Sequence, residues 1–321
     1  MKLISKYSII FIAVFLLLTA CSNENGSAEE SNFPEKDITL IVPFGPGGAV
    51  DTISRMIAQN ADEYINGQNI VVENREGGGA VIGQTFVANA EPDGYTLLAF
   101  TSSVVSNPLT TDTSYTHEDF APIALYSFEP ELLVVPSDSE LESFGEVADQ
   151  AVNGGINLVT PGHSTSHHSA GILLNENHDW NLEFVHTESA GEQIQQLLGG
   201  HVDAALLTYA EVASQIEEGT IRPIAIMGEE RSEELPDTPT FQEEGIDMVY
   251  GPFRGLAAPA DTPEETKAEL EEIFTNIIND EGFIEDMESY GFEVVAGDAA
   301  ELNSRIETEE EFIQQVLPFL E

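Results

Sequence analysis

The feature that most constrains the fold is a pair of strand–glycine loop–helix units that follow one another near the start of the chain. The apolar run Ile38–Val42 precedes a Gly-Pro-Gly-Gly loop at residues 45–48. The run Ile70–Val72 likewise precedes three successive glycines at residues 77–79. Short apolar runs of this kind suit buried parallel strands, which need helices to connect them. The pattern therefore predicts an α/β fold.

Each glycine loop is expected to lead into a helix with one apolar face. We expect the first helix to begin near Asp51, because aspartate is a residue type that caps helices well. Ile53, Met56 and Ile57 stand at i, i+3 and i+4 and would form its buried stripe. Residues 81–87 are expected to form the corresponding helix of the second unit.

The alternation of strand and helix continues along the chain, which again favours an α/β fold. Further strands are expected at Tyr95–Phe100, Leu132–Val135, Asn157–Thr160, Phe184–His186, Val202–Thr208 and Ile224–Met227. The C-terminal part is expected to be helical near residues 270–277 and 306–317. The single tryptophan, Trp180, is expected to serve core packing rather than ligand stacking.

The two glycine loops carry the first indication of function. A helix N-terminus leaves backbone N–H groups unpaired and carries a partial positive charge, and glycine lets a ligand approach the backbone closely. Ligands of open α/β sheets bind at the carboxyl ends of the strands, where both loops would lie. Two such helix starts facing one crevice predict an anion site that needs no lysine or arginine. Neither loop has the spacing of a nucleotide-binding motif.

The charge of the chain is strongly negative. Its 58 acidic and 10 basic residues give a formal net charge of −48. This excludes a nucleic-acid partner, which requires a basic surface. The acidic residues are spread along the whole chain and form no EF-hand motif, so we interpret them as a solvated surface suited to high salt.

The N-terminus has the pattern of an export signal. Lys2 and Lys6 precede an apolar run at residues 9–18 that is too short to span a bilayer. Small residues then precede Cys21, the only cysteine, in a pattern that resembles a bacterial lipobox. The resemblance implies a signal peptide over residues 1–20, lipidation of Cys21, and an extracytoplasmic, membrane-anchored protein. Residues 21–32 are polar and are expected to form a flexible tether.

Several motifs in a fixed order resemble the Bug family, the TctC-type binding proteins of tripartite tricarboxylate transporters. The first is Pro-Phe-Gly-Pro-Gly-Gly at residues 43–48 with Asp51, and the third is Pro-Asp-Gly-Tyr-Thr-Leu-Leu at residues 92–98. The remaining matching segments are residues 72–83, 162–171, 197–204, 230–241 and 255–263. The resemblance extends over essentially the whole chain after the signal peptide.

The resemblance implies a two-domain periplasmic-binding-protein fold of type II that closes on its ligand like a Venus flytrap. Residues 33–125 plus 232–321 would form domain 1, and residues 126–231 would form domain 2. The ligand would be a small carboxylate, namely a di- or tricarboxylate, an acidic amino acid or an aromatic acid. Its partners would be transporter subunits in the membrane or a sensor, and the protein would be a monomer without a cofactor or catalytic activity.

The candidate ligand-binding residues come from the loops that follow the strands of both domains. One carboxylate would be bound largely by backbone groups of the first two loops, and the rest of the ligand by domain 2. The candidates are Phe44, Gly45, Gly47, Gly48, Ala49, Asp51, Gly78, Gly79, Ala80, Ser102, Ser103, Ser164, Thr165, Ser166, His167, Thr187, Ser189 and Asp203. Asp51 could select an amine-bearing ligand or cap its helix, and Ser102, Ser103 and Asn107 could line the cleft or be ordinary loop residues.

Two residues depart from the family pattern and leave the ligand open. His186, Thr187 and Glu188 stand where the family often has Tyr-Lys-Gly, and Glu188 could repel a carboxylate, attract an amine or point into solvent. Arg254 stands where the family often has an uncharged residue. It could bind a second carboxylate through two hydrogen bonds, or it could form a surface ion pair.

Two other functions compete with carboxylate binding. His163 and His167 stand four residues apart and His168 is adjacent, a spacing that could bind zinc on a helix. A secreted hydrolase would require a Gly-x-Ser-x-Gly motif, and residues 162–166 lack the second glycine. Neither pattern has the additional ligands or catalytic partners that it would need.

Overall fold

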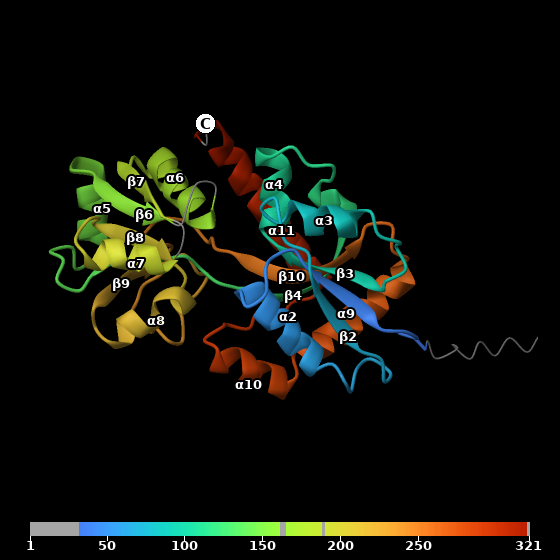
Figure 1. The fold of residues 1–321 in the computed structure, drawn as a ribbon. Helices are drawn as coiled ribbons and strands as arrows, with labels where there is room; N and C mark the ends of the chain where they lie inside the picture. The colour runs from blue at the N-terminus through green and yellow to red at the C-terminus, as the bar shows by residue number, and fades with distance from the viewer. Residues whose placement is uncertain (1–31, 161–164, 188–189, 320–321) are drawn as a thin grey trace, which may run out of the picture. The chain divides into compact units, whose positions relative to one another are not determined.

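The computed structural model describes residues 32–160, 165–187 and 190–319. Cys21 and the signal peptide lie outside the described residues. The described chain from Pro34 onward forms one compact unit that contains two five-stranded sheets, each flanked by helices (Figure 1). Both sheets mix parallel and antiparallel pairs, as the predicted α/β class requires.

The first sheet, sheet A, has the strand order β2-β1-β3-β10-β4. Strand β1 pairs in parallel with β2 and β3, whereas β10 runs antiparallel to β3 and β4. The strands are β1 (Ile38–Val42), β2 (Ile70–Asn74), β3 (Thr96–Thr101), β4 (Phe120–Phe128) and β10 (Phe253–Pro259). The predicted parallel pairing of the first strands is confirmed.

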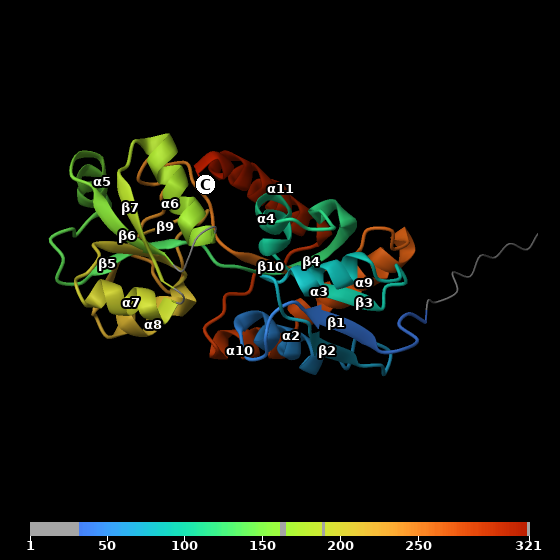
Figure 2. The same ribbon diagram turned by 45° about the horizontal axis from the view of Figure 1, so that its top comes forward.

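The second sheet, sheet B, has the strand order β7-β6-β8-β5-β9. Strand β6 pairs in parallel with β7 and β8, and β5 runs antiparallel to β8 and β9. The strands are β5 (Leu132–Pro136), β6 (Ile156–Thr160), β7 (Leu182–His186), β8 (Ala204–Leu207) and β9 (Ile221–Ile226). The view in Figure 2 shows helices on both sides of this sheet.

The helices follow the strands in the order that a parallel arrangement demands. Those that follow sheet A strands are α2 (Ala49–Gln59), α3 (Val81–Ala88) and α4 (Ser103–Thr110). Those around sheet B are α5 (Phe144–Asn153), α6 (Ser166–His178), α7 (Ala190–Leu198) and α8 (Tyr209–Glu217). The C-terminal helices are α9 (Glu264–Ile278), α10 (Glu281–Ser289) and α11 (Ala299–Val316), and short 3-10 turns lie at His117–Asp119 and Leu317–Phe319. None of the helices in the described ranges is long and apolar enough to cross a bilayer.

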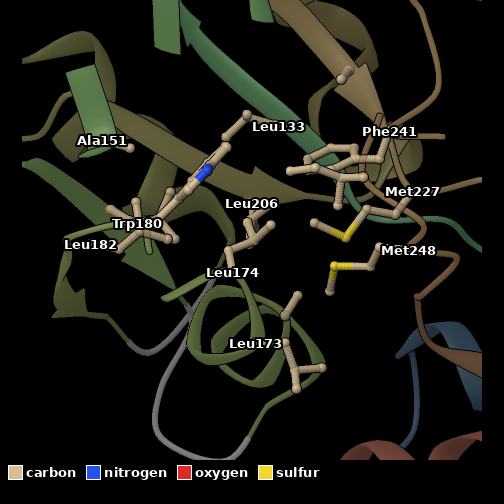
Figure 3. Packing of buried hydrophobic residues seen from close by; sticks show 14 of the residues in the cluster. Leu133, Ala151, Leu173, Leu174, Trp180, Leu182, Leu206, Met227, Phe241 and Met248 are labelled. Carbon is tan, nitrogen blue, oxygen red and sulfur yellow. The ribbon is translucent and has the colours of Figure 1, made fainter. Parts of the chain in front are cut away.

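One of the two hydrophobic clusters of sheet B contains Trp180 and is shown in Figure 3. Trp180 lies in it against the ring of Phe144, so its predicted packing role is confirmed. Phe241 and Met248, from the segment that leads back toward sheet A, belong to the same cluster. Complete burial of side chains of this size stabilises a fold by about 1.5–3 kcal/mol each.

Helix α11 takes part in the cores of both sheets. Leu302 and Ile306 pack with the core residues of sheet A, whereas Ile313 and Val316, later in the helix, pack with the core of sheet B. Two hydrophobic stretches of one helix therefore connect the two cores, in addition to the chain crossings at residues 129–131 and 227–252.

The sequence analysis did not identify strand β4, and a proline inside the strand explains why. Pro122 interrupts the apolar run, and proline argues against a central strand. The strand lies at the edge of sheet A, where proline is tolerated. The exact limits of the two expected domains stay a prediction. The first four strands of sheet A end at Phe128, sheet B extends from Leu132 to Ile226, and the chain returns to sheet A at Phe253.

Candidate functional site

The two glycine loops lie side by side at the carboxyl edge of sheet A. The side-chain amide of Asn74 donates to the carbonyl of Phe44 at 3.0 Å and so joins the second loop to the first. Gly83 packs directly between the loops, because a Cβ added there would lie 2.8 Å from Pro43 Cα and from Arg75 O. Only a glycine at this position lets the first turn of α3 approach both loops.

The structure corrects the expected start of the first helix. Helix α2 begins at Ala49 with Gly48 as its N-cap, so Asp51 lies inside the first turn. Its carboxylate accepts hydrogen bonds from Gly47 N at 2.8 Å, from Asn74 Nδ2 at 2.8 Å and from Arg55. Burial opposes the charge, but these hydrogen bonds and Arg55 outweigh it and lower the pKa of Asp51 to about 2. The Asp51 carboxylate therefore joins the first loop, through Gly47, to the second loop, through Asn74.

The second loop has a left-handed backbone. Gly77, Gly78 and Gly79 all have positive φ angles, and Ala80, the N-cap of α3, is also left-handed at φ 80°. Glycine adopts such angles without strain. Asn107 fixes the loop to α4 by donating to Gly79 O at 2.9 Å.

A cavity of about 600 Å³ lies between residues of sheet A and residues of sheet B. Its walls come from the starts of three helices, from the two chain crossings and from the loop after α10. The lining residues are Phe44, Ala49, Glu129, Thr165, Ser166, His167, Thr208, Ala210, Glu211, Pro252, Arg254 and Phe292. The volume is that of a small-molecule site.

Three helix N-termini face this cavity. Ala49 is the first residue of α2, Ser166 is the first residue of α6, and Ala210 lies in the first turn of α8. Each N-terminus carries unpaired N–H groups and a partial positive charge. The backbone of the cavity wall is therefore suited to an anionic ligand, although the chain as a whole is strongly acidic.

One buried ion-pair group lies in the sheet B wall. His167 lines the cavity, its Nδ1 forms a hydrogen bond with the carboxylate of the fully buried Glu131, and its Nε2 lies 3.7 Å from Glu211. Burial disfavours the charged ring, but the carboxylates of Glu131 and Glu211 raise the pKa of His167 to about 9. Burial raises the pKa of Glu211, and His167 partly offsets this. At neutral pH the imidazole is a cation.

A second ion pair lies in the sheet A wall. The Nη1 of Arg254 donates to the carboxylate of Glu129 and, at 3.3 Å, to Ser127 Oγ. Only 14% of the Arg254 side chain and 8% of the Glu129 side chain are exposed. Arg254 is thus no surface residue, which removes the surface ion pair as an interpretation of its role.

The structure places five of the sequence-predicted site residues in the cavity wall. These are Phe44, Ala49, Thr165, Ser166 and His167. Gly45, Gly47, Gly48, Gly78, Gly79, Ala80, Ser102 and Ser103 belong to the loops at the same edge of sheet A without lining the cavity. Ser103 Oγ accepts from Gln84 at 2.8 Å, and Thr187 N donates to Thr160 O at the carboxyl edge of sheet B.

Asp203 is placed away from the cavity. It precedes β8, and its carboxylate accepts from Asn157 N at 2.8 Å, near the start of β6. This is the amino-terminal edge of sheet B, opposite to the edge that carries the helix starts, and we do not retain Asp203 as a ligand residue. Ser164, Ser189 and Glu188 lie outside the described residues.

The cavity also contains residues that the sequence analysis missed. Thr208 and Glu211 form a capping arrangement at α8, in which the Glu211 carboxylate accepts from Thr208 N at 2.8 Å. The Thr-x-x-Glu pattern directly after a predicted strand is a helix-start signal that could have revealed them. Glu129, Pro252 and Phe292 carry no such local signal.

The histidines proposed for zinc have other contacts. His163 lies outside the described residues, and His167 is paired with Glu131. The ring of His168 packs edge-on against Phe184 and His186 at 4.7 Å. Within the described part of the chain, no three metal-binding side chains are grouped to hold an ion.

Two α/β sheets, two chain crossings and a cavity lined by helix N-termini define a solute-binding receptor. The chain belongs to the tripartite tricarboxylate transporter receptor family, TctC, whose profile matches residues 53–317. The Bug proteins are its relatives, and both the family and the fold of the sequence-based prediction are confirmed. The family consists of periplasmic, extracytoplasmic binding proteins.

Individual relatives agree with this assignment. The chain is 30% identical to protein BugT of Bordetella pertussis over 258 residues, which cover 78% of this chain and 79% of BugT. A TctC solute-binding protein from Polaromonas superimposes with a TM-score of 0.84 at 26% identity, covering 89% of this chain and 99% of that one. MatC of Rhodopseudomonas palustris, solved with bound malate, gives a TM-score of 0.67 at 26% identity, covering 89% and 100%.

Proposed function

We propose that this protein is an extracytoplasmic lipoprotein, anchored through Cys21, that captures a small organic carboxylate for a tripartite tricarboxylate-type transporter and catalyses no reaction. The observation that carries the proposal is the convergence of the starts of α2, α6 and α8 on one cavity. The malate bound in MatC supports the same ligand class. Partners would be membrane transporter subunits or a sensor, and the receptor would act as a monomer.

The magnitude of the available interactions fits such a role. Each helix end contributes about 0.3–1 kcal/mol when exposed and up to about 2 kcal/mol when partly buried. Hydrogen bonds from amides to a charged acceptor add about 1.5–3 kcal/mol each. Micromolar binding corresponds to about 8 kcal/mol, which several such contacts acting together can reach. Salt screens the distant acidic residues within about 10 Å or less, so the nearby dipoles dominate.

A thermal-shift screen tests the ligand class. The lipid-free protein is heated at high salt with mono-, di- and tricarboxylates, amino acids and aromatic acids. A ligand that binds only the folded state stabilises it by RT ln(1 + [L]/Kd), so a carboxylate is expected to raise the melting temperature. If no acid in the screen raises it, the proposed ligand class is wrong.

A pair of variants at the start of α2 provides the structural control. Ala49→Glu places a carboxylate at the helix N-terminus, where it suits the helix dipole but repels a bound carboxylate. Ala49→Gln has the same size without the charge. We expect Ala49→Glu to abolish binding and Ala49→Gln to retain most of it; equal affinities would contradict a carboxylate at this helix start.

The lipid anchor is tested separately. We expect the protein, expressed with its own signal in a bacterium, to partition into detergent and to carry a mass increment at Cys21. Cys21→Ser should remain in the aqueous phase and lack the increment. An unmodified wild-type protein would contradict the lipidation alone and leave the ligand class untouched.

A further inference from the structure

Arg254 occupies a position from which it can reach a ligand in the cavity. It is the second residue of β10 and pairs with Thr101, the last residue of β3, on one side and with Ser127 of β4 on the other. Because β10 runs antiparallel to β3, its start lies at the carboxyl edge of sheet A, beside the helix starts. Arg254 and His167 are the two cations among the described cavity-lining residues.

The guanidinium of Arg254 is only partly used by the protein. Nη1 alone donates to Glu129 and Ser127, and no hydrogen bond joins Nε or Nη2 to another residue of the described ranges. These two nitrogens form one complete edge of the planar guanidinium, and such an edge matches the two oxygens of a carboxylate. Neither nitrogen is among the buried atoms that lack a hydrogen-bond partner in the described residues, so this edge is open to the cavity and can donate to a ligand carboxylate.

The pair with Glu129 orients this edge rather than satisfying it. Glu129 lies in the first chain crossing, and its backbone N–H donates to Pro252 O at 2.9 Å, in the second crossing. Its carboxylate therefore stands at a fixed place beside Arg254. The flexible arginine side chain is held there by two acceptors, so less conformational freedom is lost when a ligand binds.

The spacing of the two anion-binding features indicates the number of carboxylates. In sheet A, β1 and β10 are separated by β3, so their ends lie two strand spacings apart, or about 10 Å. The start of α2 follows the loop after β1, and Arg254 is the second residue of β10. A ligand with a carboxylate at each end is suited to a separation of this order, with one carboxylate at each feature.

We propose that Arg254 determines specificity for dicarboxylates by binding the second carboxylate of a ligand through Nε and Nη2, while the amides at the start of α2 bind the first. This assignment rests on the proposed carboxylate-binding function and extends it to one residue and one ligand class. Glu129 is a positioning residue for Arg254, and its negative charge partly neutralises the charge of the arginine.

The test combines variants with matched ligands. Calorimetric titration uses the unbranched dicarboxylates from succinate to adipate and, for each, the monoamide that lacks one charge. The proteins are the wild type, Arg254→Lys, Glu129→Gln, and the double variant Arg254→Gln with Glu129→Gln. The double variant removes the cation without leaving Glu129 buried and unpaired, which would endanger folding.

We expect the double variant to bind the preferred dicarboxylate about 10- to 100-fold more weakly, while the affinity for its monoamide changes about threefold or less. Arg254→Lys should recover part of the loss, because lysine offers a charge without the bidentate edge. Glu129→Gln alone should bind the dicarboxylate as tightly as the wild type or more tightly, since the arginine charge is no longer offset.

Three results would overturn the proposal. One is an equal loss for the dicarboxylate and its monoamide, which would make Arg254 a purely structural residue. Another is an unchanged dicarboxylate affinity in the double variant. The third is a wild-type preference for amino acids that Glu211→Gln abolishes, which would show an ammonium site at Glu211. These failures leave carboxylate binding intact, whereas a wild type that binds no acid removes both proposals.

Discussion

Glu309 of α11 is a carboxyl group that the fold keeps away from water. It is buried beside Tyr250, whose hydroxyl donates to it at 3.4 Å, and burial raises the pKa of Glu309 to about 8. At neutral pH the folded protein therefore holds this carboxyl largely protonated, whereas the unfolded chain ionises it near its usual pKa. The same region contains Glu131, which pairs with His167. Single buried residues thus make the stability of the fold depend on pH.

The pH dependence of stability follows from the direction of these shifts. A group whose pKa is higher in the folded state contributes stability that is present below its unfolded pKa and is lost as pH rises through the folded pKa. Glu309 should cost stability between about pH 4.5 and 8, and His167 between about pH 6.5 and 9. We expect thermal melts to show a falling melting temperature across this range.

Glu309→Gln isolates the contribution of Glu309. The amide has the same shape and does not ionise, so the variant should be close to the wild type at pH 5 and more stable at pH 9, by a few kcal/mol at most. Chemical unfolding at both pH values measures the difference. A variant with the same pH dependence as the wild type would show that Glu309 does not titrate in this range.

The two chain crossings form an element of their own, a short ladder that connects the sheets. Glu129 N donates to Pro252 O, Glu131 N to Tyr250 O, and Met227 N to Glu131 O, at 2.8–2.9 Å. The ladder carries Glu129, which pairs with Arg254, and Glu131, which pairs with His167. Its packing is so close that a Cβ added at Gly251 would lie 2.1 Å from Glu129 O.

Gly251→Ala should therefore disturb the ladder. The clash is with backbone, which cannot rotate away, so we expect a loss of about 1–3 kcal/mol or more in unfolding free energy. Gly145→Ala is the matched control, because Gly145 lies in α5 with nothing within 4 Å of its added Cβ. That change should be neutral or gain up to about 1 kcal/mol. Equal effects of the two substitutions in urea unfolding would refute the clash.

Elements with a local signal were predictable, and those without one were not. The strand–glycine loop–helix units stand in the structure as β1–α2 and β2–α3, because apolar runs and glycines act within a few residues. The start of α2 was misplaced by two residues, since Asp51 is a good capping residue by type while the Gly48 backbone actually begins the helix. The edge strand β4 was not predicted, because Pro122 is tolerated only at the edge of a sheet and the sequence does not show which strand lies at the edge.

At the scale of the whole molecule, the net charge of −48 is the dominant property. Like charges on a compact body repel one another and favour the expanded chain. Salt shortens the screening length from about 10 Å at 0.1 M to about 3 Å at 1 M, which reduces that repulsion. The molecule should therefore be more stable in salt than in dilute buffer.

We expect the melting temperature to rise steadily between about 0.05 and 1 M sodium chloride, a range over which the screening length falls severalfold. Calorimetry measures the rise, and sucrose of equal osmolality, which does not screen charge, serves as the control. A melting temperature that is unchanged by chloride, or that rises equally with sucrose, would contradict self-repulsion as the cause.

The sequence by itself determined the fold class, the family and the loops expected to bind a ligand. Strands, glycine turns and amphipathic helices each produce a pattern among residues that are close together in the chain. Only the tertiary structure decided which side chains share the cavity. Glu129 and Arg254 are 125 positions apart along the chain, and Glu131 and His167 are 36 apart. Their pairing depends on the antiparallel placement of β10 and on the crossings between the sheets, which are long-range contacts. The burial of Arg254 therefore results from tertiary packing, and no pattern among its neighbours in the sequence predicts it.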